Sequence, residues 1–326
     1  MSKLTSTIDN LQILRAFAAI NVVIFHIIGT SSAYGFEPYY LKLFKGWGAN
    51  GVDIFFVLSG FVMLHSQLQK RRSAWNFLKF RIIRIVPIYW FVTLISVLSF
   101  LLIPSSAFNS DMPSIVQILE SLFFLSKALS GSEPILSVGW TLEWEMLFYI
   151  IFALSLTFSQ WNRSYIFISL GLLFISTITS ELIIIEFLFG MLIAYAFNRF
   201  KIGNKLGLII AIIGFIFLLS SINQMHLLHF NRVIIWGLPS FLIIFGLVYA
   251  DQYSSPLLKY LGDASYSIYL IHFLVISFYY KVITYISIPL NHDFLSLLCL
   301  FVAITSGAFM YSFIEKPLTS LVKSKF

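Results

Sequence analysis

The chain has 326 residues, of which 59% are hydrophobic and only 11% are charged. Soluble globular proteins carry about 25% charged residues, so this composition excludes a soluble domain and indicates a polytopic membrane protein. The formal net charge of +7 comes mostly from residues in short segments between apolar runs, a pattern typical of membrane orientation rather than of nucleic-acid binding. We therefore expect membrane lipids, and no nucleic acid, among its partners.

Taken in chain order, ten stretches approach the roughly 20 apolar residues that a membrane-spanning helix needs. We predict an all-α polytopic integral membrane protein of about ten transmembrane helices, organised as a single membrane domain over residues 1–326. The predicted spans are 11–28, 50–67, 82–103, 139–158, 164–179, 181–198, 206–222, 232–250, 265–285 and 294–314. A further apolar stretch, 114–128, is interrupted by Glu120 and Lys127, which predicts an interfacial or re-entrant segment.

Basic residues decide the predicted orientation, because cytoplasmic loops are enriched in lysine and arginine. They gather after the second, sixth and tenth spans: Lys70, Arg71, Arg72, Lys79, Arg81, Arg84, Arg199, Lys201, Lys205, Lys316, Lys323 and Lys325. Both termini are then cytoplasmic, and the protein is expected to be a multi-pass protein of the cell inner (plasma) membrane. The longest connection, 104–138, falls outside, where we expect it to give an acceptor access to the site.

The first span carries two ionisable residues, Arg15 and His26. They are eleven residues apart, and a helix turns by about 100° per residue, so both side chains lie on one face, separated by about 16 Å. Ionisable groups inside a spanning segment are costly and usually face a protein interior or a water-filled cavity. The pair therefore predicts a polar site within the bundle.

The predicted orientation sorts the unusual residues into two layers. Arg15, Arg81 and Arg84 belong to the inner layer, where a basic cluster suits the phosphates of a cytoplasmic donor, because arginine grips phosphate bidentately. The outer layer holds an imidazole and two carboxylates, a combination that suits general-base activation of a hydroxyl: His26, Asp53 and Glu145. No metal cofactor is expected.

Each of these residues also has a simpler structural interpretation. Arg81 and Arg84 can be orientation signals, Arg15 can reach the lipid headgroups, and His26 can be a hydrogen-bonding core residue. Helix packing and interhelical hydrogen bonds explain three late residues most simply: Ser265, Tyr266 and His272. Glu186 is a further carboxylate in a predicted span, without an assigned role.

Another class of protein is compatible with ten spans and buried charges, namely a transporter or flippase for a glycan or small anion. Transporters often have paired halves with corresponding broken helices. Pro87 and Pro239, the prolines inside predicted spans, do not fall at matching places of an internal repeat. This pattern favours an enzyme, and acetyl-CoA binding would distinguish the two.

Six stretches, in order, resemble the acyltransferase-3 family of integral-membrane O-acyltransferases. They are LRAFAAINVVIFH, GVDIFFVLSGFVM, FLKFRIIRIVPIYW, WTLEWEMLFY, LGDASYSIYLIH and FIEKPL. Counted from the start of the first predicted span, the resemblance covers the chain from residue 11 to residue 318. Each match is weak alone, but six in family order are specific. Ala16 stands where many members have glycine, a departure that affects no expected catalytic residue. Some members carry an additional hydrolase-like domain after the membrane part, which this sequence is expected to lack.

The resemblance implies transfer of an acyl group, most often acetyl from acetyl-CoA, to a hydroxyl of an extracytoplasmic or lipid-linked glycan. By residue, it implies that His26 is the catalytic base or acyl-relaying group and that Glu145 supports it or the acceptor. Asp53 is in a matched stretch and is grouped with these two as catalytic. The donor-binding residues are then Arg15, Arg81 and Arg84, and the substrate-binding residues are Trp140 and Tyr149.

Overall fold

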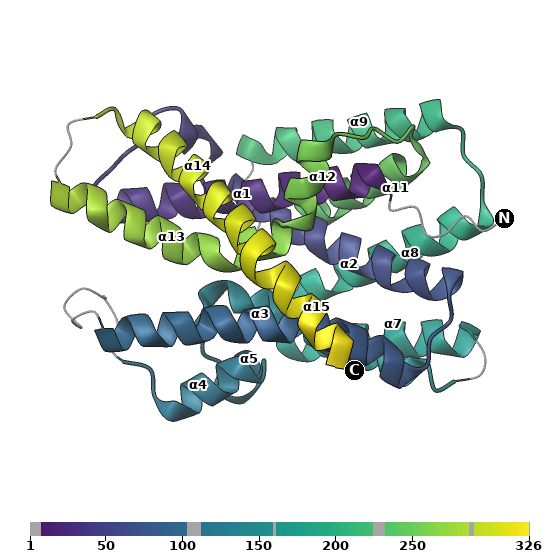
Figure 1. Ribbon diagram of the computed structural model, residues 1–326. Coiled ribbons are helices and arrows are strands. Elements are labelled where there is room, and N and C mark those ends of the chain that lie inside the picture. Colours follow the sequence, from purple (N-terminus) through teal and green to yellow (C-terminus); the bar gives the residue numbers. More distant parts are fainter. Residues whose placement is uncertain (1–7, 103–111, 159–160, 224–231, 287–289, 326) are drawn as a thin grey trace.

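The computed structural model describes residues 8–102, 112–158, 161–223, 232–286 and 290–325, and within these ranges every element is a helix (Figure 1). The longer helices are α1 (Asp9–Ala33), α2 (Asn50–Gln69), α3 (Ala74–Leu102), α6 (Trp140–Ser155), α7 (Trp161–Thr179), α8 (Glu186–Arg199), α9 (Asn204–Ser220), α11 (Leu238–Tyr249), α13 (Ser265–Ile286) and α14 (His292–Met310). The shorter ones are α4 (Ile115–Leu122), α5 (Ser126–Leu129), α12 (Pro256–Asp263) and α15 (Lys316–Lys325). Single turns complete the description: η1 (Leu41–Phe44), η2 (Trp47–Ala49), η4 (Ser137–Gly139), η5 (Leu182–Ile185), η6 (Ser221–Asn223), η8 (Val233–Gly237) and η9 (Tyr311–Glu315).

The helices confirm the all-α prediction and agree with a membrane protein. Within the described ranges, seven helical stretches are long and apolar enough to cross a membrane: Asp9–Ala33, Trp47–Gln69, Ala74–Phe100, Ser137–Ser155, Leu182–Arg199, Ser265–Ile286 and His292–Ser324. Three shorter apolar helices coincide with the remaining predicted spans: Arg163–Thr179, Asn204–Ser220 and Val233–Tyr249. The count of ten therefore depends on helices of 17 residues.

α3 and the last helix extend furthest beyond their predicted bounds. α3 begins at Ala74 rather than at residue 82, because residues 74–81 contain neither glycine nor proline. At the other end of the chain, the turn η9 joins α14 to α15 without a break in the helical path, so this helix continues past residue 314. The last residue predicted for the third span, 103, lies outside the described residues.

The predicted interfacial segment 114–128 forms the two short helices α4 and α5. Ser114 caps α4 in a capping box with Gln117, which satisfies two backbone N–H groups at once. The buried carboxylate of Glu143, in α6, accepts hydrogen bonds from the backbone N–H groups of Ser126 and Lys127 at 3.0 and 2.9 Å. Glu143 thereby fastens α5 to α6. The first part of the predicted access loop, 104–111, lies outside the described residues.

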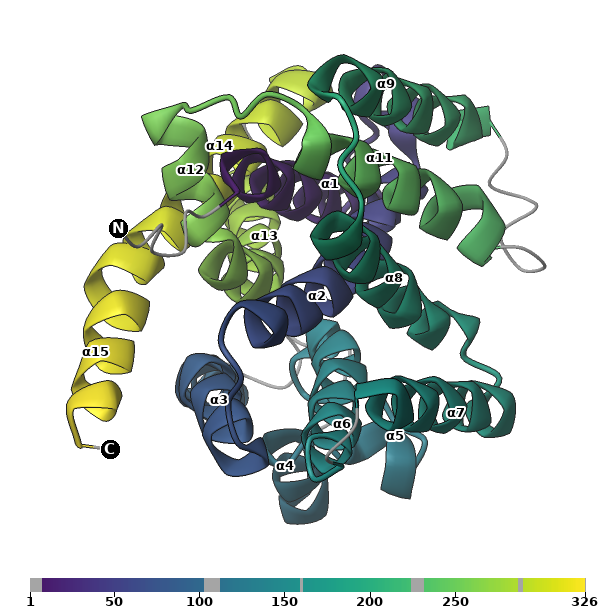
Figure 2. The ribbon, with the colours of Figure 1, turned by 90° about the vertical axis from the view of Figure 1, so that its right-hand side faces the viewer.

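We call the side of the bundle on which α1 begins the Asp9 side, and the side on which α1 ends the Ala33 side. α1, α3 and α13 run from the Asp9 side to the Ala33 side, whereas α2, α6 and α14 run the other way (Figure 1). Viewed along the bundle, α2 lies near the centre, with α1, α6 and α8 around it (Figure 2). The central position of α2 lets one helix contribute side chains to several buried clusters.

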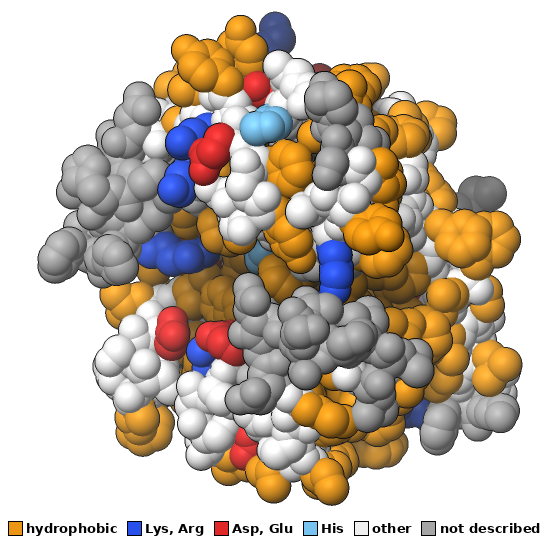
Figure 3. Space-filling model, turned by 90° about the vertical axis from the view of Figure 1, so that its left-hand side faces the viewer, with side chains coloured by type: hydrophobic (Ala, Val, Ile, Leu, Met, Phe, Trp, Pro, Cys, Tyr) orange, Lys and Arg blue, Asp and Glu red, His pale blue; other side chains and the backbone are white. Residues whose placement is uncertain are grey.

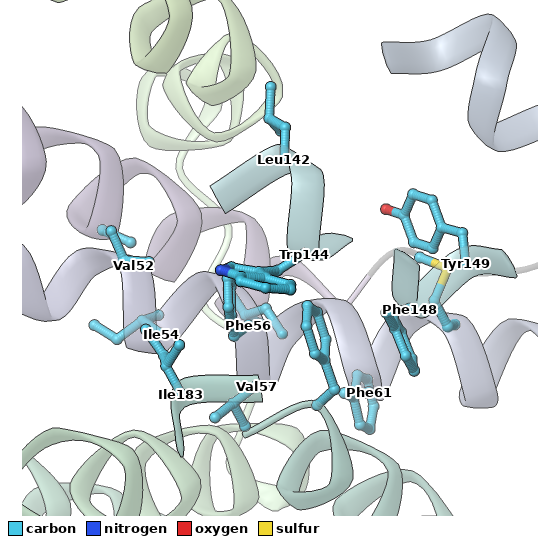
Figure 4. Packing of buried hydrophobic residues seen from close by; sticks show 14 of the residues in the cluster. Val52, Ile54, Phe56, Val57, Phe61, Leu142, Trp144, Phe148, Tyr149 and Ile183 are labelled. Carbon is cyan, nitrogen blue, oxygen red and sulfur yellow. The ribbon is translucent and has the colours of Figure 1, made fainter. Parts of the chain in front are cut away.

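Close helix packing around α2 depends on aromatic rings and on two glycines. The ring of Phe187 is stacked between Phe56 and Phe148, with ring centres 4.5 and 4.3 Å away, in the packed region that Figure 4 shows. Such ring pairs contribute about 0.5–1.5 kcal/mol each beyond simple burial. A Cβ at Gly60 or Gly190 would overlap the backbone of the facing helix, so glycine permits the close α2–α8 contact.

Candidate active site

A cavity that is open to solvent lies where five helices meet, and its wall is largely apolar apart from four charged side chains. Its empty volume of about 790 Å³ includes part of that solvent. α1, α2, α3, α6 and α13 all contribute to its wall, and each of these helices carries one of the matched sequence stretches. We call it the arginine pocket. Its polar lining consists of Arg15, Arg81, Arg84, Glu145, Ser59, Thr141, Tyr149, Ser265, Tyr266 and Tyr269.

The three arginines of the pocket form none of the ion pairs found within the described residues. Arg15 donates two hydrogen bonds to the hydroxyl of Ser265, from Nε at 3.3 Å and from Nη2 at 3.1 Å. The guanidinium of Arg81 lies over the rings of Phe77 and Tyr149, and its buried Nε has no hydrogen-bond partner among the described residues. These cations therefore have unused donor capacity that faces an empty space, and an anion would satisfy it.

Glu145 is the one acidic side chain of the pocket lining. Its Oε1 accepts hydrogen bonds from Ser59 at 2.8 Å and from the hydroxyl of Tyr149. Tyr149 lies one helical turn after Glu145 on α6, at the i, i+4 spacing expected from the sequence, and Ser59 comes from α2. Two donors on one oxygen fix the orientation of the carboxylate, so Glu145 presents its second oxygen with a defined direction.

His26 is not part of the pocket lining and lies next to a second histidine. The rings of His26 and His272 are 5.0 Å apart at 74°, and Phe25 and Phe273 also place ring edges against His26. Neither Asp53 nor Glu145 forms a hydrogen bond or ion pair with His26 in the described parts of the chain. The three residues predicted to be catalytic, His26, Asp53 and Glu145, therefore do not contact one another through hydrogen bonds or ion pairs among the described residues.

The connection to the pocket passes through Tyr269. This tyrosine lines the pocket, where its hydroxyl shares a hydrogen bond of 2.8 Å with Thr141. Its ring centre lies 5.8 Å from that of His272. From the arginine pocket towards His26, the side chains therefore follow in the order Tyr269, His272 and His26. The two histidines meet where α1 packs against α13.

Asp53 belongs to a separate cluster, which we call the paired cluster. Arg232 grips it bidentately, with Nε to Oδ1 at 3.0 Å and Nη2 to Oδ2 at 2.8 Å. The carboxyl of Glu186 lies beside Asp53, at a distance where the two can share a hydrogen bond if one of them carries a proton. Both oxygens of Glu186 are buried, and the described residues offer them no other donor. The catalytic assignment of Asp53 stays a prediction.

Trp140, predicted to bind substrate, stands at the first residue of α6 and packs against the hydrophobic core. It is outside the pocket lining, whereas Tyr149, the other predicted substrate residue, is part of it. The last matched stretch contains Glu315, whose carboxylate accepts a hydrogen bond of 2.5 Å from Ser267. Ser267 is two residues after Ser265, which lines the pocket. No group of three or more potential metal ligands occurs among the described residues.

The face on the Ala33 side is hollowed across its middle, with hydrophobic side chains in its depth and charged ones around it (Figure 3). The connection between α1 and α2 is also on this side, where Asp293, at the start of α14, accepts hydrogen bonds from the backbone N–H groups of Tyr39, Tyr40 and Leu41. In the same connection, hydrogen bonds from Lys42 and Ser32 lower the pKa of the exposed Glu37 carboxyl. The connection between α1 and α2 is thus tied to the start of α14.

Comparison with known proteins identifies the family of the chain. Residues 8–313 match the acyltransferase domain that defines the acyltransferase-3 family. The chain belongs to this family. As a family member it is a membrane O-acyltransferase, which confirms the enzyme class predicted from the six sequence stretches and decides against a transporter.

Two curated relatives illustrate the range of this acyltransferase family. The chain is 30% identical to the exopolysaccharide production protein ExoZ of Rhizobium meliloti (strain 1021), over 83% of this chain and 89% of the relative. It is 27% identical to a Staphylococcus aureus (strain COL) protein whose name describes an O-acetyltransferase, over 95% of this chain and 57% of the relative. The chain thus spans little more than half of that longer relative. No solved structure matches the chain.

Several contacts in and around the candidate site were not predicted from the sequence. Ser59 looks like any small residue of an apolar helix, and only its contact with Glu145 marks it. Nothing in the sequence marks Arg232, the first residue of the predicted span 232–250, as the partner of Asp53. His272 was interpreted as a packing residue; the signal that could have found it is its i, i+7 spacing from Ser265, which places both on the face that meets α1.

Proposed function

We propose that this acyltransferase moves an acetyl group from acetyl-CoA to a hydroxyl of a cell-surface or lipid-linked polysaccharide. The observation that carries the proposal is the arginine pocket: three guanidinium groups, without ion-pair partners in the described parts of the chain, line an empty space whose remaining wall is largely apolar. Phosphates would satisfy the guanidinium donors, and a pantetheine arm would match the apolar wall. The names of the relatives, an exopolysaccharide production protein and an O-acetyltransferase, support a polysaccharide acceptor and an acetyl group.

In this proposal the Asp9 side faces the cytoplasm and the protein lies in the cell inner membrane. The connection between α2 and α3, which is on the Asp9 side, contains Lys70, Arg71 and Arg72, in accordance with the excess of basic residues in cytoplasmic loops. Acetyl-CoA would then enter from the cytoplasm, where it is made. The acceptor would approach from the hollowed Ala33 side (Figure 3).

The chemical step would take place where the far end of the donor meets His26. With its phosphates on Arg15, Arg81 and Arg84, the donor would extend along the face that Arg15 and His26 share, over about 16 Å. Neutral His26 would take the proton of the acceptor hydroxyl as its oxygen bonds to the thioester carbonyl carbon. The C–S bond then breaks, and the CoA thiolate leaves and receives the proton.

Glu145 would hold the pocket end of this arrangement. Because Ser59 and Tyr149 fix its orientation, its free oxygen can accept a hydrogen bond from an amide or hydroxyl of either substrate. A covalent acyl-histidine formed on His26 is the alternative chemistry. A burst of acyl-enzyme when acetyl-CoA is supplied without acceptor would indicate that route, and its absence would indicate direct attack.

The decisive experiment is mass analysis of surface polysaccharide from cells with and without the protein. We expect one fragment to lose the mass of an acetyl group when the protein is absent and to regain it with wild type but not with His26→Ala. Acetyl-CoA binding by both purified proteins serves as the folding control. Unchanged polysaccharide acetylation without the protein, or full acetylation by His26→Ala, would contradict the proposal.

A further inference from the structure

Two imidazoles lie side by side in the interior, His26 on α1 and His272 on α13, with ring centres 5.0 Å apart. His26 is partly exposed, whereas His272 is completely buried. Their surroundings are otherwise largely aromatic and aliphatic, with Phe25 and Phe273 against His26. Buried histidines in a membrane bundle need a hydrogen-bonding role, because a polar ring there loses its water.

The hydrogen bonds of the two rings define which nitrogens are free. Nδ1 of His272 lies 3.2 Å from the carbonyl oxygen of Ile268, and Nδ1 of His26 lies 3.4 Å from that of Val22. A carbonyl oxygen can only accept, so Nδ1 donates in each ring and Nε2 of each neutral ring carries a lone pair. Nε2 of His272 is buried and has no partner among the described residues. This nitrogen is therefore a hydrogen-bond acceptor without a donor among the described residues.

The unpartnered nitrogen is next to the ring that would react. Tyr269, whose ring is 5.8 Å from that of His272, forms the boundary with the arginine pocket. His272 therefore lies between the arginine pocket and His26. A ring-centre distance of 5.0 Å is compatible with a hydrogen bond between nitrogens of the two rings.

We propose that His272 is a positioning residue that shares with His26 the proton removed from the acceptor hydroxyl. The inference rests on the proposed function. As the hydroxyl oxygen bonds to the thioester carbonyl carbon and the C–S bond breaks, the hydroxyl proton passes to Nε2 of His26. Nε2–H of His26 then donates to Nε2 of His272, and the pair holds the positive charge until the CoA thiolate takes the proton. Sharing the proton between two imidazoles stabilises the imidazolium in an apolar interior, where an isolated charge is strongly disfavoured.

Other titratable side chains must be considered in interpreting a pH profile of this pair. On the elements packed against α13 they include Arg15 and His26 of α1, Arg81 and Arg84 of α3, Lys259 and Asp263 of α12, Cys299 of α14 and Glu315 and Tyr311 of η9. On α13 itself they include Tyr266, Tyr269, Tyr279 and Tyr280. Of all these, His26 and Tyr269 are the groups in ring contact with His272 within the described residues.

The test measures acetyl transfer by the full-length protein in detergent, with acetyl-CoA as donor and surface polysaccharide from cells lacking the protein as acceptor. For His272→Phe, which keeps an aromatic ring but removes both nitrogens, we expect kcat to fall about 100-fold. KM for acetyl-CoA should change by less than about twofold, because the arginine pocket is intact. The acid limb of the pH profile should move to lower pH, because His26 then holds the proton alone.

Two further variants separate this role from a structural one. His272→Gln keeps a hydrogen-bond acceptor, so it should retain more activity than His272→Phe, and it replaces that variant if the phenylalanine protein does not fold. His65→Phe is the matched control, because His65 also stacks on a ring, that of Phe61 at 5.2 Å, and lies outside the site. It should leave both kcat and the pH profile unchanged.

The outcomes distinguish this inference from the proposed function. Wild-type transfer together with an unchanged kcat and pH profile in His272→Phe would overturn the role of His272 and leave the acyltransfer reaction intact. Equal losses in the Phe and Gln variants without any shift of the pH profile would also overturn it, in favour of packing. A wild-type protein that binds acetyl-CoA but transfers nothing to the polysaccharide would overturn the function on which the inference rests.

Discussion

The arginine pocket and the paired cluster both place arginine and carboxylate side chains inside the bundle. They differ in the number of positive charges relative to negative ones. The pocket has three arginines and one glutamate around an empty volume of about 790 Å³. In the paired cluster Asp53 binds the one arginine, Arg232, bidentately, and Glu186 lies beside them. The guanidinium of this arginine already has an anionic partner. α2 contributes to both, through Ser59 in the pocket and Asp53 in the cluster.

This difference separates a binding site from a structural one. A buried charge must find a partner, and within the paired cluster that partner is supplied by the chain itself. In the arginine pocket the described residues supply fewer anions than cations, so we expect an anionic ligand to complete the charge balance. The comparison predicts that substitutions in the paired cluster change stability, whereas substitutions in the pocket change ligand binding.

The largest effect is expected for Asp53→Asn, which leaves Arg232 without its bidentate partner. Breaking a buried pair typically destabilises a protein by about 3–5 kcal/mol, so the thermal midpoint in detergent should fall clearly while acetyl-CoA affinity of the folded fraction is preserved. Arg232→Gln should behave in the same way. A large loss of kcat at unchanged stability would instead support the predicted catalytic role of Asp53.

The next effect is expected for the pocket arginines. Arg81→Ala and Arg84→Ala should each weaken acetyl-CoA binding by roughly 10- to 100-fold, since a charged hydrogen bond contributes about 1.5–3 kcal/mol. The thermal midpoint should not fall, because neither arginine is paired within the described residues. Equilibrium dialysis with labelled acetyl-CoA measures the affinity. Arg72→Ala is the control, since Arg72 lies over the ring of Phe80 outside the pocket; an equal loss there would indicate a nonspecific charge effect.

A smaller effect is expected for Ser59→Ala, which removes one of two donors to Glu145. Loss of a single hydrogen bond, about 1 kcal/mol, should reduce kcat/KM for acetyl transfer roughly fivefold. The matched control is Ser96→Ala, because Ser96 donates only to a carbonyl of its own helix, that of Val92. If both substitutions reduce kcat/KM equally, the orientation of Glu145 is not important for transfer.

The smallest effect is expected for Glu186→Gln. An amide can donate to the carboxylate of Asp53 without needing a shared proton, and it preserves the shape of the side chain. The free energy of unfolding should therefore change by less than about 1 kcal/mol, as followed by thermal unfolding. Destabilisation comparable to that of Asp53→Asn would show that the cluster needs the carboxyl group of Glu186 itself.

The sequence was sufficient for the fold class and for grouping Arg15, Arg81 and Arg84, which line one pocket. Ten apolar stretches predict helices of the right approximate lengths, and the spacing within each motif predicts which side chains share a face, as with Glu145 and Tyr149. The helix ends were less predictable, since α3 begins at Ala74, eight residues before the predicted span, in a segment with neither glycine nor proline. Local pattern therefore predicts elements better than boundaries.

Contacts between helices were beyond such reasoning. Nothing in the neighbourhood of Asp53 indicates that its partner is Arg232, and the interpretation of two layers placed Asp53, Glu145 and His26 together because they share a depth in the membrane. Depth restricts a residue to a plane, not to a position within it. The structure distributes the three residues over the paired cluster, the arginine pocket and the histidine pair.

The bidentate pair has a consequence for how the protein is made. Asp53 and Arg232 are 179 residues apart, and at a synthesis rate of 5–20 residues per second Asp53 waits roughly 9 to 36 s for its partner. During that time α2 must enter the membrane with an unmatched acidic residue near one end, at a penalty of up to about 3 kcal/mol. The strongly apolar remainder of α2 offsets this penalty, so the helix can wait in the bilayer until the second half of the chain arrives.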